Sequence, residues 1–320
     1  MSNHKKISNK IEELIIDNPG SPFRLSWVNI TGADQEEISY LKKRFNFKIQ
    51  NLNASISTVF SQRPMIFEED GYLFMILHFP IFENNKIIPA EIEFFVGHGF
   101  LITAHNDNIP ALGKFFNFCK ENKDSLLSYV NESSVMLLYE ILDRLIKDCY
   151  PLIDKNSIKI DEVEEQIFSK TQKQTADGIL SVKRNIINLQ KILQNHKNIL
   201  KHLTEMKSSI VERDLIKKHY DGLVEHSKRI WEMLDIQKDI IDALHDTSES
   251  ISNAKMTSIM KTLTMFSVII FPLTLFAAIF AMRTAYLPLE SHPYGFWLII
   301  GIMAFIAVIM LLIFKKKRWM

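Results

Sequence analysis

The chain has 320 residues, of which 47% are hydrophobic and 23% charged, and its formal net charge is +1. This composition is that of an ordinary globular protein, except that the apolar residues are concentrated near the C-terminal end. The part up to Met282 has a formal charge of −3, which argues against nucleic acid as a partner.

The N-terminal segment and the cysteines exclude several further classes. Residues 1–10 lead into an acidic, amphipathic stretch, IEELIIDN, without the apolar core of a secretory signal. Cys119 and Cys149 are not part of a CxxC motif, so we predict reduced core thiols rather than a redox or zinc site. Because the chain also lacks the P-loop, GxGxxG, GxSxG and HExxH motifs, we predict neither an enzyme nor a cofactor.

Residues 1–150 are expected to form a mixed α/β domain. Alternating apolar and polar residues predict a strand at 23–30, and helical spacing predicts a helix at 34–45. The glycines of Gly97-His98-Gly99 predict a tight turn between two strands. Further strands are expected at 55–60, 72–82, 91–96 and 100–104, and further helices at 112–118 and 125–147.

Residues 151–261 are expected to form a helical hairpin and a long stalk helix. Gly178 predicts a turn, and apolar spacing predicts a helix over 180–211. The acidic residues at the start of this region favour a solvated helix face over a cation site. They are Asp161, Glu162, Glu164 and Glu165.

The stalk is predicted to continue into the membrane without a break. Between Gly222 and Pro272 there is neither proline nor glycine, so one helix of roughly 75 Å can run through this stretch. An apolar stripe that includes Ile230, Leu234 and Ile241 follows the same helix. A stripe on so long a helix calls for identical neighbours, and a symmetric homo-oligomer is therefore expected.

Two uncharged apolar runs of 21 residues, 262–282 and 294–314, are each long enough to cross a bilayer. The residues between them, 283–293, are expected to form a short extracytoplasmic loop. The tail, 315–320, contains three lysines and an arginine, which resist translocation. We therefore predict a two-span protein of the plasma membrane, the inner membrane of a bacterium, with both termini cytoplasmic.

Several segments resemble the CorA family of divalent-cation channels. Gln62-Arg63-Pro64 with Tyr72-Leu73-Phe74 resembles one strand region of that family, and 91–105 resembles its next hairpin. Residues 260–264 and Pro272-Leu273-Thr274 are similar to its first membrane span. The resemblance covers nearly the whole chain. It implies an α+β cytoplasmic domain, an α/β/α sandwich, followed by a stalk helix and two C-terminal membrane helices, in a funnel of five identical subunits.

The resemblance also implies which residues line a pore along the first span. Hydroxyl oxygens there can hold the water around a hydrated cation, and large apolar side chains can form constrictions. The implied pore-lining residues are Thr257, Met260, Ser267, Phe271, Thr274 and Ala278. Without the resemblance, the same residues are more simply interpreted as facing lipid or other helices.

The family signature is altered at the pore mouth. The family ends its first span with Gly-Met-Asn, and the asparagine there holds a hydrated cation, whereas this chain has Ala281, Met282 and Arg283. Arginine has no acceptor and stays charged. Two readings remain open: Arg283 faces the axis and repels divalent cations, or it turns outward to the headgroups or to Glu290.

The family also senses cytoplasmic cations through carboxylates between subunits. Asp246 resembles one of these residues and is the candidate regulatory metal ligand, whereas Ser55-Ile56 replaces its acidic partner pair. Half of that site is therefore missing. His219 and His226 share one helix side and are expected to be solvated rather than metal ligands.

The function implied by the resemblance is passive passage of a divalent cation, Mg²⁺ by family default, through a homopentameric pore. The cation is cargo and not a cofactor. Two alternatives stay open because of Arg283 and Ser55-Ile56. One is a scaffold or regulator of the same shape that no longer conducts cations, and the other is selection for a different ion, including an anion.

Overall fold

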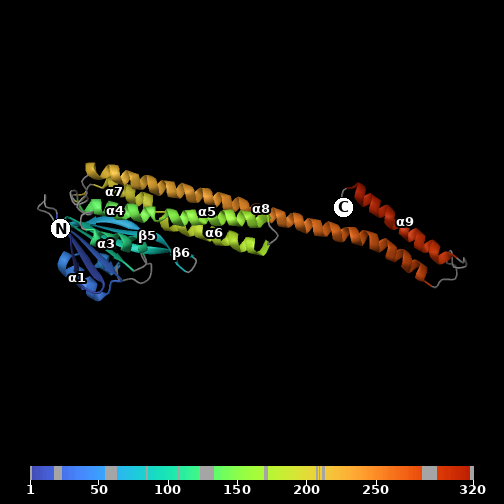
Figure 1. The fold of residues 1–320 in the computed structure, drawn as a ribbon, viewed down its shortest axis with the longest axis horizontal. Coiled ribbons are helices and arrows are strands. Elements are labelled where there is room, and N and C mark those ends of the chain that lie inside the picture. Colours follow the sequence, from blue (N-terminus) through green and yellow to red (C-terminus); the bar gives the residue numbers. More distant parts are fainter. Residues whose placement is uncertain are drawn as a thin grey trace. The chain divides into compact units, whose positions relative to one another are not determined.

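The computed structural model describes residues 2–17, 24–54, 63–83, 86–106, 109–122, 133–168, 172–206, 208, 210, 213–282 and 294–317 (Figure 1). The chain divides into two compact units, Met1–Leu244 and His245–Met320. Each unit is described separately below.

The first unit is built on a sheet of seven strands within the described residues. Their order across the sheet is β1-β2-β3-β7-β6-β5-β4, and all neighbours are antiparallel except β3 and β7, which are parallel. The strands are β1 (Ser2–Lys6), β2 (Ile11–Asp17), β3 (Arg24–Thr31), β4 (Met65–Glu69), β5 (Tyr72–Glu83), β6 (Lys86–Gly97) and β7 (Phe100–His105).

Helices cover both faces of this sheet. In the first unit they are α1 (Gln35–Phe45), α2 (Ile49–Ala54), α3 (Pro110–Glu121), α4 (Ser134–Lys147), α5 (Tyr150–Phe168), α6 (Gln172–Leu193) and α7 (His196–Glu205). α8 (Arg213–Ala281) begins in this unit and extends into the second, which also contains α9 (Gly295–Lys316). Figure 1 shows α1 on one side of the sheet and α3 to α7 on the other.

Two hydrophobic clusters, one on each face of the sheet, hold the layers together. Trp27 belongs to the cluster that also contains buried residues of α3 to α8, such as Leu189 and Leu234. Phe95 belongs to the cluster that packs against α1 and α2 through residues such as Leu41. Because both faces of the central strands are covered, β5 and β6 carry nearly continuous apolar runs instead of alternating patterns. The predicted α/β/α sandwich with a long stalk helix is confirmed.

Most of the predicted elements are present, with two corrections among the helices. Gly178 does not end a helix but lies within α6, where an added Cβ atom would come 2.9 Å from Cγ2 of Val163 on α5. The glycine therefore permits close helix packing. The helix predicted over 180–211 is in fact two helices, because the chain turns at residues 194–195 between α6 and α7. The strand predicted at 55–60 lies outside the described residues.

The N-terminal strands β1 and β2 were not predicted. The alternation of β2 is interrupted by Glu12 and Glu13, and yet Glu13 is only 1% exposed. Its carboxylate forms a salt bridge with Arg44 of α1 and accepts a hydrogen bond of 2.6 Å from Ser26. A buried acid is tolerated when it is paired in this way. The charged residue Glu13 in β2 is therefore explained by its partner Arg44, which lies 31 residues further along the chain.

The two cysteines are reduced and buried, as predicted. Cys119 and Cys149 are each 1% exposed, and both are free thiols. Burial raises the pKa of Cys119 to about 12 and that of Cys149 further still. Both thiols therefore stay protonated and unreactive at neutral pH.

Two carboxyl groups are buried side by side on β6. Glu91 and Glu93 are 8% and 5% exposed, their carboxyl groups are in hydrogen-bonding contact, and Nε2 of His78 lies 2.8 Å from Oε2 of Glu91. Burial, and secondarily the contact with Glu91, raises the pKa of Glu93 well above its usual range. Two carboxyl groups in hydrogen-bonding contact must share a proton, so we infer that the Glu93 carboxyl is neutral in the folded protein.

This buried proton predicts a pH dependence of stability. The folded pKa of Glu93 lies above an unfolded value of about 4.3, so the protein loses stability as the pH rises from that value through the folded pKa. Glu93→Gln removes this titration. We expect the unfolding temperature of the variant, relative to wild type, to rise between about pH 5 and about pH 8. Thermal unfolding of the full-length protein in detergent measures this difference. Glu225→Gln, an exposed acid on α8, is the control, and a pH-independent difference for Glu93→Gln would contradict the shared proton.

Candidate functional site

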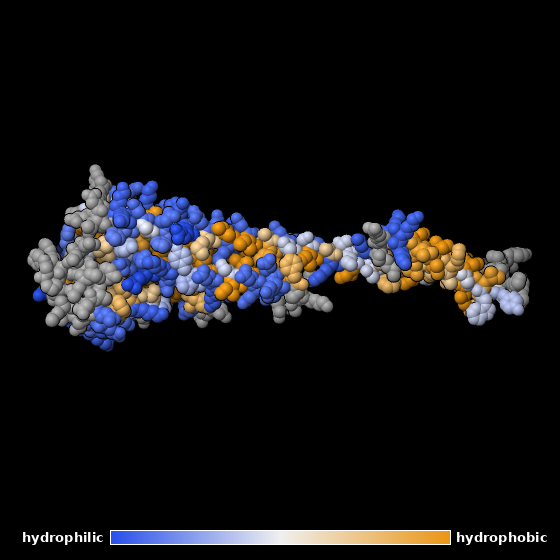
Figure 2. Space-filling model, turned by 45° about the horizontal axis from the view of Figure 1, so that its top comes forward, coloured by the Kyte–Doolittle hydropathy of each residue, from blue (hydrophilic) through white to orange (hydrophobic). Residues whose placement is uncertain are grey.

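The second unit exposes long apolar stretches on both of its described helices. Two helices, Lys217–Ala281 and Gly295–Lys316, are long and apolar enough to cross a membrane, with mean hydropathy of 2.3 and 3.0 over their most apolar windows. None of the residues in these windows is buried. Figure 2 shows the corresponding apolar side chains as a nearly continuous surface on these helices. A soluble protein rarely exposes such a surface, so the two helices fit a bilayer environment.

The first of these helices continues from the first unit without interruption. α8 contains 69 residues, as the absence of glycine and proline between Gly222 and Pro272 predicts. Pro272 lies inside the helix. Since proline has no amide hydrogen, the carbonyl of Val268 has no donor from the next turn and is available as an acceptor.

The six predicted pore-lining residues fall on one stripe of α8. At 3.6 residues per turn they lie within about 100° of arc, and five of them are exposed in the single chain, while Ser267 is half-buried. Between Met265 and Phe280 the opposite side of the helix is half-buried, at Met265, Ile269, Pro272, Phe276 and Phe280. Most of the stripe is therefore left uncovered by the single chain.

The hydroxyl groups of the stripe are held in a defined orientation. Oγ1 of Thr257 donates to the carbonyl of Asn253 at 2.8 Å, Oγ of Ser267 to Leu263 at 3.0 Å, and Oγ1 of Thr274 to Ile270 at 2.8 Å. Because each hydroxyl hydrogen is used within the helix, the oxygen lone pairs point away from the backbone. These oxygens can accept hydrogen bonds from water molecules around a hydrated cation.

The large side chains of the stripe alternate with these oxygens. Met260 and Phe271 are 55% and 73% exposed in the single chain. Rings of such residues in a symmetric bundle would form apolar constrictions between the hydroxyl layers. In such a bundle the stripe would offer both polar contacts and narrow points to a passing ion.

The pore mouth is described only in part. α8 ends at Ala281, and Met282 is 58% exposed and donates its amide hydrogen to the carbonyl of Ile279 at 3.3 Å. Arg283 and Glu290 lie outside the described residues. Which way Arg283 points therefore stays a prediction.

The predicted regulatory ligand, Asp246, lies outside any metal-binding group that the described residues form. Asp246 is exposed on α8, and in the described part of the chain no three His, Cys, Asp or Glu side chains are grouped to hold a metal. Ser55-Ile56, the position of the missing acids, lies outside the described residues. The two histidines are half-buried rather than solvated: Nδ1 of His226 lies 3.1 Å from the Tyr150 hydroxyl, and the His219 ring packs 5.0 Å from that of Tyr139.

The fold and these helices define a class: a membrane protein with two apolar helices, the first of which continues from an α/β unit. Comparison with known proteins makes the class specific. The family model of the CorA-like Mg2+ transporter protein matches residues 24–316. The chain belongs to this family, whose members are transporters and not enzymes.

Individual members of the family are similar in sequence to this chain over nearly its whole length. The cobalt/magnesium transport protein CorA of Methanocaldococcus jannaschii is 23% identical over 311 residues, which cover 97% of this chain and 95% of that protein. The cobalt/magnesium transport protein CorA of Thermotoga maritima is 26% identical over 306 residues, with 93% and 86% covered.

Solved structures share the fold. The complete structure of the CorA magnesium transporter from M. jannaschii superposes with a TM-score of 0.85 at 22% identity, covering 100% of this chain and 98% of that one. The structure of the full-length CmaX protein gives a TM-score of 0.74 at 16% identity, covering 93% and 90%. The comparisons therefore favour transport over a scaffold without transport activity.

Proposed function

We propose that this protein carries Mg²⁺ or another divalent cation down its gradient through a pore lined by α8 of several copies, five by the family resemblance. The observation that carries the proposal is the stripe of oriented hydroxyl groups on the exposed side of a helix that runs from the cytoplasmic unit into an apolar span.

The chemistry of the stripe suits a hydrated divalent cation. Mg²⁺ gives up its water reluctantly and usually keeps several water molecules when bound. The hydroxyl oxygens of Thr257, Ser267 and Thr274 can accept hydrogen bonds from that water without displacing it. No charged side chain lies between Thr262 and Met282 to bind the ion tightly. Weak contacts at several levels allow an ion to leave as well as to enter.

The orientation in the membrane follows from the two spans and the basic tail. Lys315, Lys316 and Lys317 follow the second span and favour the cytoplasmic side. With two crossings, the N-terminal unit lies on the same side. We place the protein in the bacterial inner membrane, where the long cytoplasmic part of α8 connects the first unit to the pore.

Ion flux into proteoliposomes tests this function directly. We expect vesicles that contain the purified full-length protein and a Mg²⁺-sensitive dye to take up Mg²⁺ faster than protein-free vesicles. A membrane potential that is negative inside the vesicles should increase this uptake rate. Uptake equal to that of protein-free vesicles would contradict the proposal. Uptake of an anion instead, detected by reversal potentials in asymmetric salt, would support the alternative in which Arg283 selects a different ion.

A further inference from the structure

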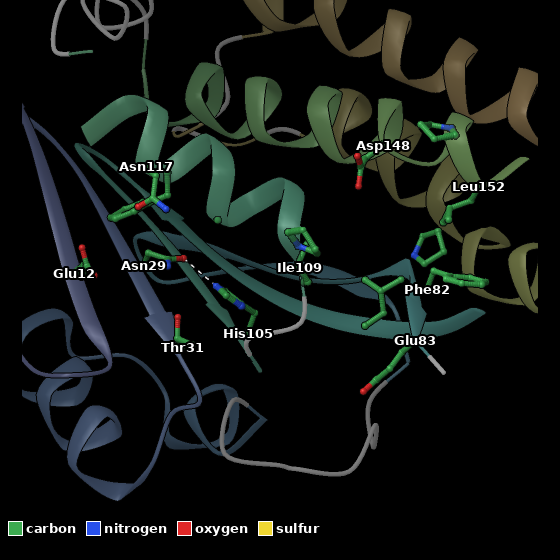
Figure 3. Close-up of a pocket in the computed structure, with 16 residues that line it drawn as sticks. Glu12, Asn29, Thr31, Phe82, Glu83, His105, Ile109, Asn117, Asp148 and Leu152 are labelled. Atoms are coloured by element: carbon green, nitrogen blue, oxygen red, sulfur yellow. Dashed lines mark hydrogen bonds between the residues drawn. The ribbon is translucent and has the colours of Figure 1, made fainter. Parts of the chain in front are cut away.

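One cavity lined by described residues lies in the first unit, remote in sequence from the membrane helices. Its volume is about 730 Å³, within the range of small-molecule sites. It lies at one end of the sheet, where β3, β5 and β7 end beside the first turns of α3 and α5 (Figure 3). Three prolines, Pro80, Pro110 and Pro151, are among its lining residues and restrict the backbone around it.

The floor of the cavity is a directed chain of hydrogen bonds. Nε1 of Trp27 donates to Oγ1 of Thr103 at 3.1 Å, and that hydroxyl donates to Oδ1 of Asn29 at 2.7 Å. Nε2 of His105 lies 3.2 Å from the same oxygen and therefore acts as its second donor (Figure 3). Indole is a donor only, so the direction of the chain is fixed. The Asn29 amide is thus held in one orientation before any ligand arrives.

The charge of the lining favours cationic over anionic ligands. No described lining residue is a lysine or an arginine, whereas three are acids: Glu12, Glu83 and Asp148. Glu12 is paired with Lys120 at 2.9 Å and with His4 at 2.6 Å. Glu83 and Asp148 are exposed at the rim. A phosphate or carboxylate would meet the negative charges of these acids, whereas a cation would be attracted to them.

The walls argue for an organic cation over a bare metal ion. Ile109, Phe116 and Leu152 supply apolar surface to the lining of the cavity. The ring of Phe82, also in the lining, already holds the ammonium of Lys155 at 3.7 Å from its centre. A divalent metal prefers several oxygen ligands close together, and the described residues contain no such group.

The arrangement of the acids suggests a ligand with two charged ends. Figure 3 shows Glu12 on one side of the cavity and Glu83 and Asp148 on the other, with Ile109 between them. We propose that this cavity binds an aliphatic diamine or polyamine, with its ammonium ends toward these acids and its methylene chain against Ile109, Phe116 and Leu152. This site is separate from the pore residues and does not depend on ion transport.

Gly113 offers a way to close the cavity without disturbing the fold. This residue lines the cavity within α3, and an added Cβ atom would meet no other atom within 4 Å. Gly113→Leu therefore places a side chain into the cavity and also raises helix propensity. Gly222→Leu on α8 is the matched control, because its added Cβ atom is equally free and this glycine does not line the cavity.

Calorimetric titration of the full-length protein in detergent with 1,4-diaminobutane tests the site. We expect saturable binding by wild type and Gly222→Leu, loss of binding in Gly113→Leu, and affinity reduced at least about ten-fold in the double variant Glu83→Gln, Asp148→Asn. Absence of saturable binding by wild type, or unchanged binding by Gly113→Leu, would overturn the proposal. Equal affinity for 1-aminobutane would overturn the assignment of two charged ends. Since no step measures flux, failure here is distinguishable from failure of the transport proposal.

Discussion

A positive charge tethered at position 274 is expected to abolish cation uptake. In the proposed pore, Thr274 of every copy faces the axis, so each Thr274→Cys chain would carry one cation into the path after reaction with a membrane-impermeant, positively charged thiol reagent. Several like charges in a narrow path repel a divalent ion strongly. We expect proteoliposome uptake to fall to the level of protein-free vesicles after the reaction, and to recover when a reducing agent releases the group.

The chain supplies its own controls for this experiment. Cys119 and Cys149 are buried and protonated, so wild-type uptake should not respond to the reagent. Phe276→Cys places the thiol on the half-buried side of α8, about 200° around the helix from Thr274. Inhibition at Phe276→Cys together with none at Thr274→Cys would show that the other side of α8 lines the path.

Restoring the family signature at the pore mouth is expected to increase uptake. In the double variant Ala281→Gly, Arg283→Asn, an amide oxygen replaces a fixed positive charge at the position that holds a hydrated cation in the family. Each charge pair about 4 Å apart in water is worth roughly 1 kcal/mol, so removing a ring of them should raise the Mg²⁺ uptake rate by about ten-fold or more. The effect should be larger at low ionic strength because salt screens the repulsion.

The single variant Arg283→Lys separates charge from shape. It keeps the positive charge and should retain the wild-type rate if repulsion at the mouth limits uptake. A double variant no faster than wild type would mean that Arg283 turns away from the axis, toward the headgroups or Glu290. In that case the hydroxyl stripe alone, and not the mouth, would set the rate.

The long helix and the central strands could be predicted because their causes are local. The absence of glycine and proline between Gly222 and Pro272 permits α8 whatever surrounds it, and the apolar runs of β5 and β6 reflect burial on both faces. Gly178 misled the prediction because its cause is tertiary: the neighbouring helix leaves no room for a side chain. β2 was missed for the same kind of reason, since Glu13 depends on Arg44 from another element.

The candidate site could be predicted from the sequence only in part. Helical spacing places the hydroxyl stripe on one side of α8, but only the family resemblance says that this side faces a pore. The direction of each hydroxyl, set by its hydrogen bond to the preceding turn, became visible in the structure. The cavity beneath α3 has no local signature, because residues between Glu12 and Leu152 on several elements line it together.

Among the described strands, the one parallel pair, β3 and β7, affects how the sheet assembles. Strands β1 to β3 and strands β4 to β7 are two meanders. In each of them, consecutive strands pair with one another across short connections. Only the seam between β3 and β7, where Ser26 meets Phe100, joins them, and closing it must bring together segments far apart in the chain. During synthesis the first meander therefore leaves the ribosome with β3 as an open edge. The β3 edge stays unpaired until β7 has been synthesised. During this interval the edge can pair with other chains, so this is when protection by a chaperone matters most.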